Sequence, residues 1–438
     1  MNVRQIALRL LCEYEAGEKY INLSLSSHAA DKLSREDRAA LTALLYTTVE
    51  HKITYDYYIC AISKRSDADI DLRTKNILRL GLCQIIDMEK IPDFAAVNET
   101  VKLAEGKGER AFVNGVLRAA VRMKDSLPMP SREKNLKRYL SVKYSFPLAT
   151  VKHFLSFLSE SETEALLDYY NTVKYTDITV NTVKISVDEY IKMLSAEGIA
   201  VEKNNAAPTS LRINKSVNPE ILPGFSEGLF FVQDRASAIS SAVLSPVENE
   251  CVADVCAAPG GKSFAAAIRM NGRGRVYSFD LHESKLSLIN SGAKRLGLSI
   301  IEAKVLDATA PDESLFGKMD KVICDAPCSG LGVLAKKPDI RYKDIESLVL
   351  APLQLEILSA SAKYLKDGGE LVYSTCTLNR EENEGVISTF LLENENFELV
   401  PYTLGEINAE DGMLTLLPHV HKTDGFFIAK LRKRKDNE

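Results

Sequence analysis

The chain has 438 residues, of which 45% are hydrophobic and 26% charged, and its formal net charge is −5. This composition is ordinary for a globular protein, and the length allows two or three domains with large cores. It excludes a globally basic nucleic-acid binder, so any surface for nucleic acid must be local. The 8 cysteines stand singly, without a Cys-x-x-Cys pair, which argues against a zinc site and a secreted disulfide framework, and we expect no bound metal.

No apolar run approaches the ~20 residues that a membrane span requires. The first residues, from Met1 to Gln5, open an amphipathic pattern and do not resemble a signal peptide. We therefore expect a cytoplasmic protein that has no membrane partner and acts as a monomer. Reducing conditions would keep its thiols available for chemistry.

Residues 1–126 carry the apolar periodicity of helices almost throughout, which predicts an all-α domain. Ser34, followed by Asp37, indicates the start of a helix. Further predicted helices cover 72–88, 99–103 and 112–123. The two prolines of Leu127–Ser131 cannot continue a helix and predict a linker.

Two runs near the end of this helical domain are distinctive. Ala95–Ala104 reads AAVNETVKLA, and Ala111–Arg118 reads AFVNGVLR. Both resemble the NusB-type helical RNA-binding domain of antitermination factors. One departure is Tyr46–Thr48, where that family usually has a glycine. The resemblance implies that the first domain binds RNA.

A small α/β domain is predicted over 132–231. It begins with a basic helix over 132–144, which is either a solvated face or a surface that faces RNA. The periodicity then changes, and the predicted elements are a strand over 178–182, a helix over 188–197 and a strand over 210–213. This order suits a ferredoxin-like arrangement. Gln233–Ser237 then indicates the start of a helix that leads into a third domain.

Strands and helices alternate through the third predicted domain, 232–434, which is the pattern of a doubly wound parallel α/β sheet. The predicted strands are 251–255, 276–279, 301–305, 321–324 and 369–373. The helices that connect most of them are 262–270, 284–296 and 351–365. The closing stretches, 412–418 and 425–431, predict a final antiparallel pair.

A glycine pair follows the first strand of this domain. Gly260 and Gly261 would let the backbone approach a ligand closely, and the helix that starts there favours a carboxylate or phosphate. The loop matches neither Gly-x-Gly-x-x-Gly nor the Walker A pattern. On its own, the pair could equally be no more than a tight turn.

Aspartates end four successive strands, at Asp254, Asp280, Asp307 and Asp325. Asp280 stands where an acidic residue takes ribose hydroxyls in nucleotide-binding α/β folds, and Asp307 could accept from an adenine amino group. Each could singly be a helix cap or a turn residue. Together they favour a positively charged cofactor that bears adenosine, because several carboxylates would repel a pyrophosphate.

Two cysteines follow two of the strands. Cys328 lies in the run Asp-Ala-Pro-Cys-Ser-Gly that starts at Asp325, and Cys376 lies in Tyr-Ser-Thr-Cys-Thr, which starts at Tyr373. The carboxyl edge of an open parallel sheet is where ligands bind, and one helical crossover fits between the two positions. The alternative is a pair of small buried apolar residues. At strand ends beside polar groups, however, a thiolate can act as a nucleophile.

The glycine loop and the two cysteine runs together resemble the RNA 5-methylcytosine methyltransferases of the NOL1/NOP2/sun family. With the NusB-type start, the whole chain resembles the bacterial branch that methylates 16S ribosomal RNA. The resemblance implies that Cys376 is the nucleophile and that Cys328 aids product release. It also implies S-adenosylmethionine bound by Cys256, Ala257, Ala258, Pro259, Gly260, Gly261, Lys262, Asp280, Asp307 and Asp325. Arg380 departs from the family, which commonly has proline there.

This chemistry explains why such residues are needed. Carbon 5 of cytosine is a poor nucleophile until a thiolate adds to carbon 6. We expect Asp325 to protonate or hydrogen-bond N3 of the ring, with Lys262 orienting either Asp325 or the nucleophile. The predicted function is therefore methyl transfer to carbon 5 of a cytosine in 16S ribosomal RNA. The alternative is a non-catalytic RNA-binding or transcription-regulating protein.

Overall fold

The structure, a computed structural model, describes residues 2–17, 33–172, 175–343 and 349–435. Contacts between residues group the chain into two compact units. Unit 1 is Met1–Asn171 with Leu334–Ile345, and unit 2 is Thr172–Val333 with Glu346–Glu438. The three domain ranges drawn from the sequence, 1–126, 132–231 and 232–434, stay a prediction.

Unit 1 is built from helices, as the apolar periodicity predicts; the part of that prediction over 18–32 lies outside the described residues. Ser34 caps its helix by accepting a hydrogen bond from the backbone N–H of Asp37. The helices in the described part of unit 1 are α1 (Val3–Glu15), α3 (Arg35–Glu50), α4 (Lys52–Ser63), α5 (Leu72–Ile86), α6 (Asp93–Val101), α7 (Gly106–Arg122), α8 (Leu136–Tyr144), α9 (Leu148–Leu155) and α10 (Glu160–Thr172).

Several helix limits differ from those predicted. The helices predicted over 99–103 and 112–123 are the later parts of α6 and α7, which begin at Asp93 and Gly106. Pro92 occupies the N-cap of α6, and glycines and charged residues open α7, so both starts read as loop in the sequence. Helix α8 begins at Leu136, later than predicted, because the side chain of Asn135 caps it there.

Unit 1 also holds the short segment Leu334–Ile345, which leaves unit 2 and returns to it. The buried guanidinium of Arg341 lies 4.2 Å from the ring centre of Phe146, and its Nη2 donates to the carbonyl oxygen of Tyr170 at 3.2 Å. The Tyr342 hydroxyl donates to the carbonyl oxygen of Val49 at 2.6 Å. These contacts fix the segment on the helices of unit 1.

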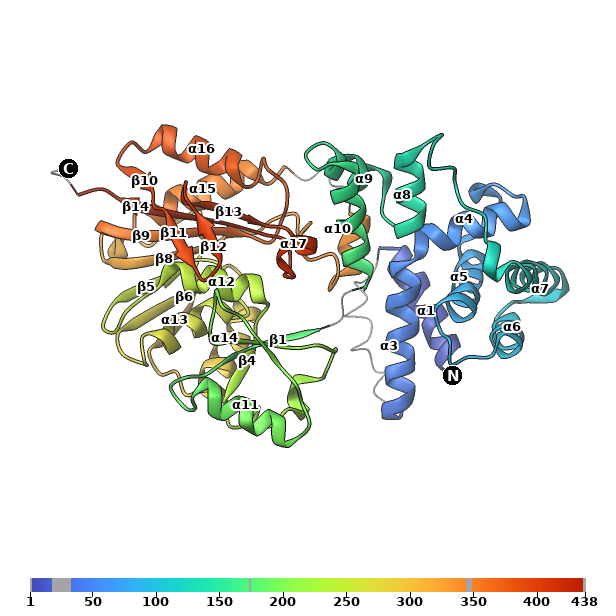
Figure 1. The fold of residues 1–438 in the computed structure, drawn as a ribbon, viewed down its shortest axis with the longest axis horizontal. Helices are drawn as coiled ribbons and strands as arrows, with labels where there is room; N and C mark the ends of the chain where they lie inside the picture. Colours follow the sequence, from blue (N-terminus) through green and yellow to red (C-terminus); the bar gives the residue numbers. More distant parts are fainter. Residues whose placement is uncertain (1, 18–32, 173–174, 344–348, 436–438) are drawn as a thin grey trace. The chain divides into compact units, whose positions relative to one another are not determined.

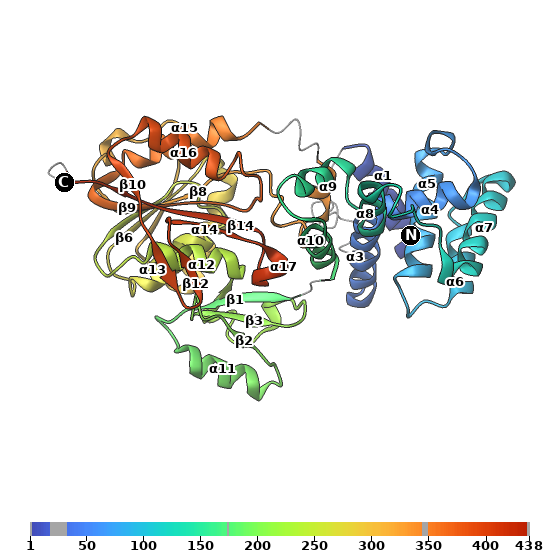
Figure 2. The same cartoon turned by 45° about the horizontal axis from the view of Figure 1, so that its top comes forward.

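The first part of unit 2 is a small antiparallel sheet, which packs against the helix α11 (Val187–Ala196). The strands, in the order β2-β3-β1-β4, are β1 (Thr176–Val180), β2 (Glu202–Lys203), β3 (Ser210–Ile213) and β4 (Phe230–Val232). Tyr190 and Leu194 of α11 pack on Ile178, Leu211 and Phe230 in one core cluster. The helix therefore covers one face of the small sheet (Figure 2).

The rest of unit 2 is a doubly wound sheet, which confirms the predicted fold class. Strands β5 to β9 pair in parallel, and β14 runs antiparallel to both β9 and β13, as predicted for the closing stretches. The sheet order is β10-β14-β9-β8-β5-β6-β7, with β13 beside β14. The bounds are β5 (Cys251–Asp254), β6 (Arg275–Asp280), β7 (Ile301–Val305), β8 (Met319–Asp325), β9 (Leu365–Thr375), β10 (Phe397–Leu399), β13 (Met413–Leu416) and β14 (Phe426–Lys433).

Helices cover both faces of this sheet, so each face has a hydrophobic core of its own (Figure 1). One face carries α12 (Arg235–Leu244), α13 (Gly261–Arg269) and α14 (Glu283–Leu296), and the other carries α15 (Ala351–Ala362) and α16 (Glu384–Glu393). A short pair, β11 (Tyr402–Leu404) with β12 (Ile407–Ala409), and α17 (Pro418–His421) complete the unit. None of the helices in the described ranges is long and apolar enough to cross a membrane.

The strand order determines where the candidate functional side chains meet. It reverses direction between β5 and β8, and the carboxyl ends of these parallel strands meet at one edge of the sheet. Ligands bind at such a switch point in open α/β sheets. Asp254 ends β5 and Asp325 ends β8, so the topology sets these carboxyl groups side by side at that point.

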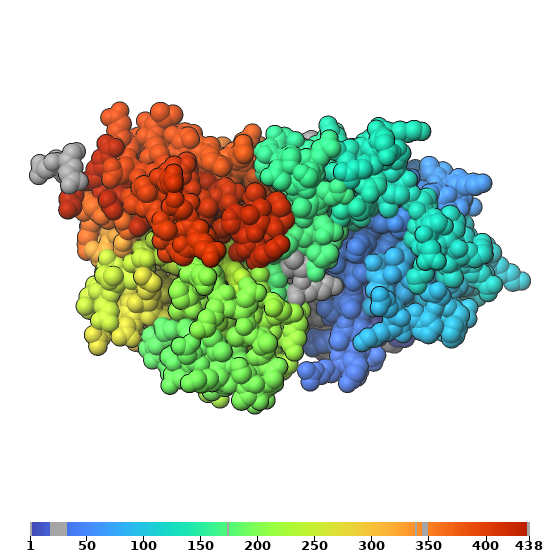
Figure 3. Space-filling model, viewed as in Figure 1, coloured from blue at the N-terminus to red at the C-terminus, as the bar shows by residue number. Residues whose placement is uncertain are grey.

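Figure 3 shows green residues of the small α/β part next to red residues near the C-terminus on the surface of unit 2. Arg212 of β3 pairs with the buried carboxylate of Asp177 at 2.7 Å. Its Nη1 donates to the carbonyl oxygen of Lys422 at 2.5 Å. Arg212 thus attaches the small sheet to the segment that precedes β14 through this hydrogen bond, whereas its ion pair with Asp177 lies within the small sheet.

Candidate active site and cofactor pocket

The turn between β5 and α13 forms a cradle for a ligand. Gly260 has a φ of +112°, and a Cβ at this position would lie 2.4 Å from the ring of Phe264, so only glycine fits. Helix α13 begins at Gly261 without a side-chain cap, which leaves the N–H groups of its first turn available to an anion.

A pocket of about 210 Å³ opens over this turn. Three of its lining residues, Asp234, Asp254 and Asp325, carry carboxyl groups. An acidic wall beside an uncapped helix start fits a ligand that bears both a positive centre and a carboxylate. The other lining residues are Val232, Gln233, Ser237, Cys256, Ala257, Ala258, Pro259, Gly261 and Lys262.

The predicted cofactor residues lie at different distances from this pocket. Of the run from Cys256 to Lys262, only Gly260 is not a lining residue, and its role is to shape the turn. Asp280 lies next to the run, because its Oδ2 accepts the N–H of Ala258 at 3.3 Å. Asp307 is exposed, and its Oδ1 accepts both the N–H and the hydroxyl of Thr309, as in an Asx turn.

Asp254 is the most deeply buried acidic group at the site, at 1% exposure. Its Oδ2 accepts from the hydroxyl of Ser263 at 2.7 Å, and its Oδ1 has no partner within the described part of the chain. Burial raises the pKa of Asp254 to about 7, and the Ser263 hydrogen bond opposes this shift only in part.

An ion pair joins the pocket to the strand end of β8. Lys262 Nζ lies 2.7 Å from Asp325 Oδ2, and the other oxygen of Asp325 accepts from the hydroxyl of Ser374 at 2.7 Å. Lys262 also donates to Ser237 Oγ at 3.2 Å. The Lys262 ammonium and the Ser374 hydroxyl therefore hold the Asp325 carboxylate in one orientation.

The two predicted cysteines lie together. Cys328 follows β8 and Cys376 follows β9, the neighbouring parallel strand, and their sulfur atoms are 3.2 Å apart. Both are free and half-buried. The hydrogen bond to Cys376 and burial raise the pKa of the Cys328 thiol well above its usual value. The raised pKa favours the protonated form of Cys328, and either sulfur can donate the hydrogen bond between the two residues.

Close backbone contact holds the loop of Cys328 against the loop of Cys376. The N–H of Gly332 donates to the carbonyl oxygen of Cys376 at 2.9 Å, and the N–H of Gly425 donates to the carbonyl oxygen of Gly332 at 2.8 Å. A Cβ on Gly332 would lie 1.8 Å from the carbonyl oxygen of Gly425. A residue with a side chain at 332 would force these loops apart.

Sequence analysis missed three polar residues of this site. Ser374 lies within the quoted run before Cys376, and Gln233 and Ser237 lie in the run that indicated the start of α12. The sequence shows only that these residues stand next to a motif. That position does not distinguish a residue that caps a helix from one that contacts the site. Within the described residues, no group of three or more His, Cys, Asp or Glu side chains could hold a metal ion.

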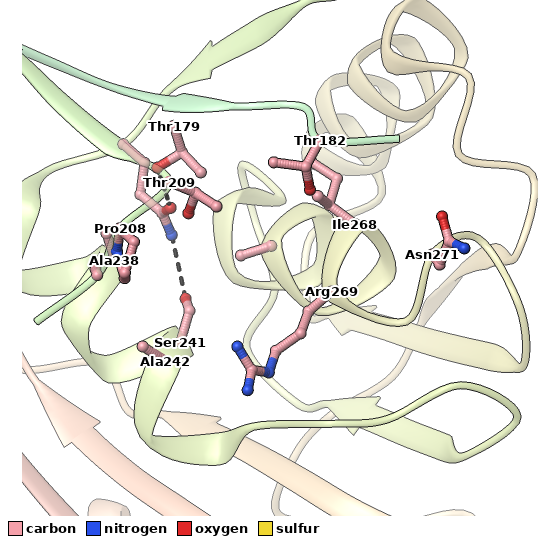
Figure 4. Close-up of a pocket in the computed structure, with 13 residues that line it drawn as sticks. Thr179, Thr182, Pro208, Thr209, Ala238, Ser241, Ala242, Ile268, Arg269 and Asn271 are labelled. Carbon is pink, nitrogen blue, oxygen red and sulfur yellow. Dashed lines mark hydrogen bonds between the residues drawn. The ribbon is translucent and has the colours of Figure 1, made fainter. Parts of the chain in front are cut away.

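Gln233 belongs to two pockets at once. It lines the 210 Å³ pocket and also a neighbouring pocket of about 320 Å³, around which Thr179, Ser241 and Arg269 lie in Figure 4. Its Oε1 accepts from the Thr179 hydroxyl at 2.9 Å, and its Nε2 donates to the carbonyl oxygen of Gly261 at 3.3 Å. This buried amide thus connects the small sheet to the start of α13.

A doubly wound sheet with a glycine turn and an acidic pocket at its switch point fits the class of S-adenosylmethionine-dependent methyltransferases. Comparison with known proteins supports this class and narrows it. The family model described as 16S rRNA methyltransferase RsmB/F matches residues 241–432. The NusB family model matches residues 1–122, and the ferredoxin-like domain of RsmF/B-like methyltransferases matches 151–220. Both domain resemblances drawn from the sequence are thereby confirmed.

Individual relatives agree with the family models. The probable ribosomal RNA small subunit methyltransferase B of Bacillus subtilis is 37% identical, with 99% of each chain covered. The crystal structure of PH0851 superimposes with a TM-score of 0.78 at 27% identity and 99% coverage of both chains. The structure of NSun6 from Pyrococcus horikoshii with SFG matches 67% of this chain and 100% of its own, with a TM-score of 0.58 at 24% identity, a likeness in fold. The chain belongs to the 16S rRNA methyltransferase RsmB/F family.

Proposed function

We propose that this protein methylates carbon 5 of a cytosine in 16S ribosomal RNA through a covalent bond between Cys376 and the base. The observation that carries the proposal is the pair of sulfur atoms, 3.2 Å apart at the ends of neighbouring strands. The Lys262–Asp325 ion pair lines the cofactor pocket, and Asp325 ends β8 shortly before Cys328 in the chain. A nucleophile, a second thiol and a fixed carboxylate are the groups that this reaction requires.

The proposed cofactor residues are the run Cys256–Lys262 with Asp280, Asp307 and Asp325. Bound S-adenosylmethionine supplies an electrophilic methyl group on a sulfonium. The uncapped N–H groups at the start of α13 suit its carboxylate, and the acidic wall of the pocket suits its positive charge. Asp280, at the end of the next strand, suits the ribose hydroxyls.

Gln233→Ala should weaken cofactor binding about 10-fold, because the start of α13 loses the hydrogen bond from a buried amide to Gly261. Isothermal titration calorimetry of S-adenosylmethionine measures this dissociation constant. Asn271→Ala is the matched control, since Asn271 lines only the neighbouring pocket. An unchanged dissociation constant in the Gln233 variant would remove this residue from the cofactor site.

Cys376 adds to carbon 6 of the cytosine as a thiolate. A sulfur–carbon bond forms, the electrons of the C5–C6 double bond move, and carbon 5 becomes the nucleophile that takes the methyl group. The cytosine must first leave its stack to reach the thiol, as bases do in enzymes of this kind. The adduct then decays when the carbon 5 proton is removed and the sulfur–carbon bond breaks.

In its protonated form, Asp325 donates a hydrogen bond, or the proton itself, to N3 of the ring and so makes carbon 6 more electrophilic. Its orientation is fixed by Lys262 on one oxygen and Ser374 on the other. The two donors leave the carboxylate little freedom to rotate, which favours one geometry toward the base.

Cys328 removes the carbon 5 proton after methyl transfer. Its pKa is raised chiefly by the hydrogen bond to Cys376 and by burial. Once Cys376 is bonded to carbon, its sulfur carries no charge and accepts poorly, so the first of these causes disappears. The Cys328 thiol then gives its proton to water more readily, and the thiolate that remains takes the carbon 5 proton as the bond between the Cys376 sulfur and carbon 6 breaks.

Bisulfite sequencing of 16S ribosomal RNA, from cells with and without the gene, tests the proposal. One cytosine should be protected from conversion only when the gene is present. A non-catalytic RNA-binding protein would leave the pattern of protected cytosines unchanged. Methylation at a ring nitrogen or at a ribose would also leave carbon 5 unmodified and would overturn the assignment.

A further inference from the structure

A buried carboxylate that the proposed reaction does not use lies beneath the two cysteine loops. Glu382 is 1% exposed. Its Oε2 accepts the backbone N–H of Ser329 at 2.9 Å and Nε2 of Gln354 at 2.9 Å, and its Oε1 accepts Nδ2 of Asn379 at 3.0 Å. All three donors are neutral, and in the described part of the chain no lysine or arginine pairs with this carboxylate.

These hydrogen bonds join segments that the sequence keeps apart. Ser329 directly follows Cys328, whereas Glu382 lies in the loop that follows Cys376. Gln354 of α15 donates to Glu382 and also to the carbonyl oxygen of Pro327, just before Cys328. The carboxylate therefore holds the backbone on both sides of Cys328 to the loop that carries Cys376.

A second hydrogen bond supports the same junction. The hydroxyl groups of Ser329 and Thr377 lie 2.7 Å apart, so the residues that directly follow the two cysteines are also bonded to each other. Thr377 is in turn held through its carbonyl oxygen by Nδ2 of Asn383, at 3.1 Å. Two links made by side-chain hydrogen bonds, one through Glu382 and one between Ser329 and Thr377, thus hold together the loops that carry Cys328 and Cys376.

The chemistry of the junction requires an acceptor with no hydrogen to donate. Ser329 offers a backbone N–H, and Gln354 and Asn379 offer amide N–H groups, so three donors converge on one side chain. A carboxylate takes all of them, whereas a glutamine would direct its own NH₂ at one of these donors. Burying a charge without a cation is costly, which indicates a role beyond packing.

We propose that Glu382 is a positioning residue that keeps Cys328 aligned for the step that resolves the covalent adduct. This inference rests on the proposed function. The carboxylate does not touch the base or the cofactor; it acts through the backbone of Ser329 and Pro327. Its negative charge also adds to the causes that keep Cys328 protonated before the base binds.

Glu382→Gln should therefore resemble the loss of Cys328 and not the loss of Cys376. With RNA and S-adenosylmethionine, kcat should fall about 10- to 100-fold and the KM for RNA should fall with it, so that kcat/KM stays within about twofold, because the variant impairs a step after addition. Covalent protein–RNA complex should accumulate on a denaturing gel. Glu381→Gln is the matched control, since Glu381 is the exposed neighbour.

Thermal unfolding of each variant separates this role from simple loss of structure. If Glu382→Gln does not fold, Gln354→Met gives the answer, because it removes the shared donor and leaves the carboxylate in place. That variant should also accumulate the complex, to a smaller extent. A folded variant of either kind that turns over normally, or that loses activity and complex together, overturns the inference.

The proposed function fails in a different way. RNA that contains 5-fluorocytosine has no removable proton at carbon 5 and should trap the wild-type protein as a stable adduct. If the wild-type protein forms no such adduct, the covalent mechanism itself is wrong. If the wild-type and Cys328→Ala proteins both form complex and Glu382→Gln does not accumulate it, only the role of Glu382 is wrong.

Discussion

Cys376→Ala should abolish methylation, with a loss of about 1,000-fold or more, and should form no covalent complex with RNA. The reason is chemical, because no other described side chain at the end of β9 offers a sulfur to carbon 6 of the base. Transfer of radioactive methyl groups to 16S ribosomal RNA measures the rate, and a denaturing gel detects the complex. Normal methylation by this variant would exclude Cys376 as the nucleophile.

Cys328→Ala should behave differently, although its sulfur lies only 3.2 Å from that of Cys376. Of the two thiols, addition and methyl transfer need only that of Cys376, so both steps should proceed once. The adduct should then persist, because the group that we assign to removal of the carbon 5 proton is missing. The variant should show a single turnover and a strong protein–RNA band. A variant that turns over at the wild-type rate without such a band would contradict the assigned role.

The sheet could be predicted because its strands are short buried apolar runs that alternate with helices. The contact between the cysteines followed from the same logic. Strands β8 and β9 are consecutive in the sequence and are joined by one helical crossover through α15, so the usual rule of neighbouring parallel strands brings their ends together. An alternation of strands and helices therefore predicts which distant residues lie close together, because each strand–helix–strand unit places its two strands side by side.

Glu382 shows what such patterns do not contain. It stands in Asn379–Asn383, a run of polar residues that reads as an exposed turn. Its donors Ser329 and Gln354 lie 53 and 28 residues away, and only the tertiary fold brings them together. The helices α9 and α10 were missed for a related reason: the polar residues between their short apolar stretches carry no clear period.

The four aspartates at or near strand ends also show that sequence position alone does not predict the surroundings of a side chain. Asp254, Asp280 and Asp325 end strands and Asp307 follows shortly after one, yet the surroundings of the four aspartates differ widely. Asp254 is buried and Asp325 is in an ion pair, whereas Asp307 forms an exposed turn with Thr309. Position along the strand is visible in the sequence, but burial depends on the helices that cover that edge.

Asp254→Asn should change how stability depends on pH. Burial raises the pKa of Asp254 in the folded protein to about 7, from an ordinary value of 3.8. Between these pH values the folded state holds a proton that the unfolded state has lost. The stabilisation is therefore complete below pH 3.8 and disappears as the pH rises through 7. The free energy of unfolding of the wild-type protein should fall by about 2.5 kcal/mol between pH 5 and pH 8 for this reason.

An asparagine stays neutral across this range, so the Asp254→Asn variant should lack that decline. Its amide oxygen can accept from Ser263, and its NH₂ would occupy the place of Oδ1, which has no partner within the described residues. Denaturant unfolding at several pH values gives the free energy of unfolding for each protein. Asp307→Asn is the control, because the N–H and hydroxyl of Thr309 lower the pKa of Asp307, and it titrates below this range. If wild-type and Asp254→Asn proteins lose stability in parallel from pH 5 to pH 8, Asp254 is ionised in the folded state, and the pocket holds one more negative charge next to Lys262 than we infer.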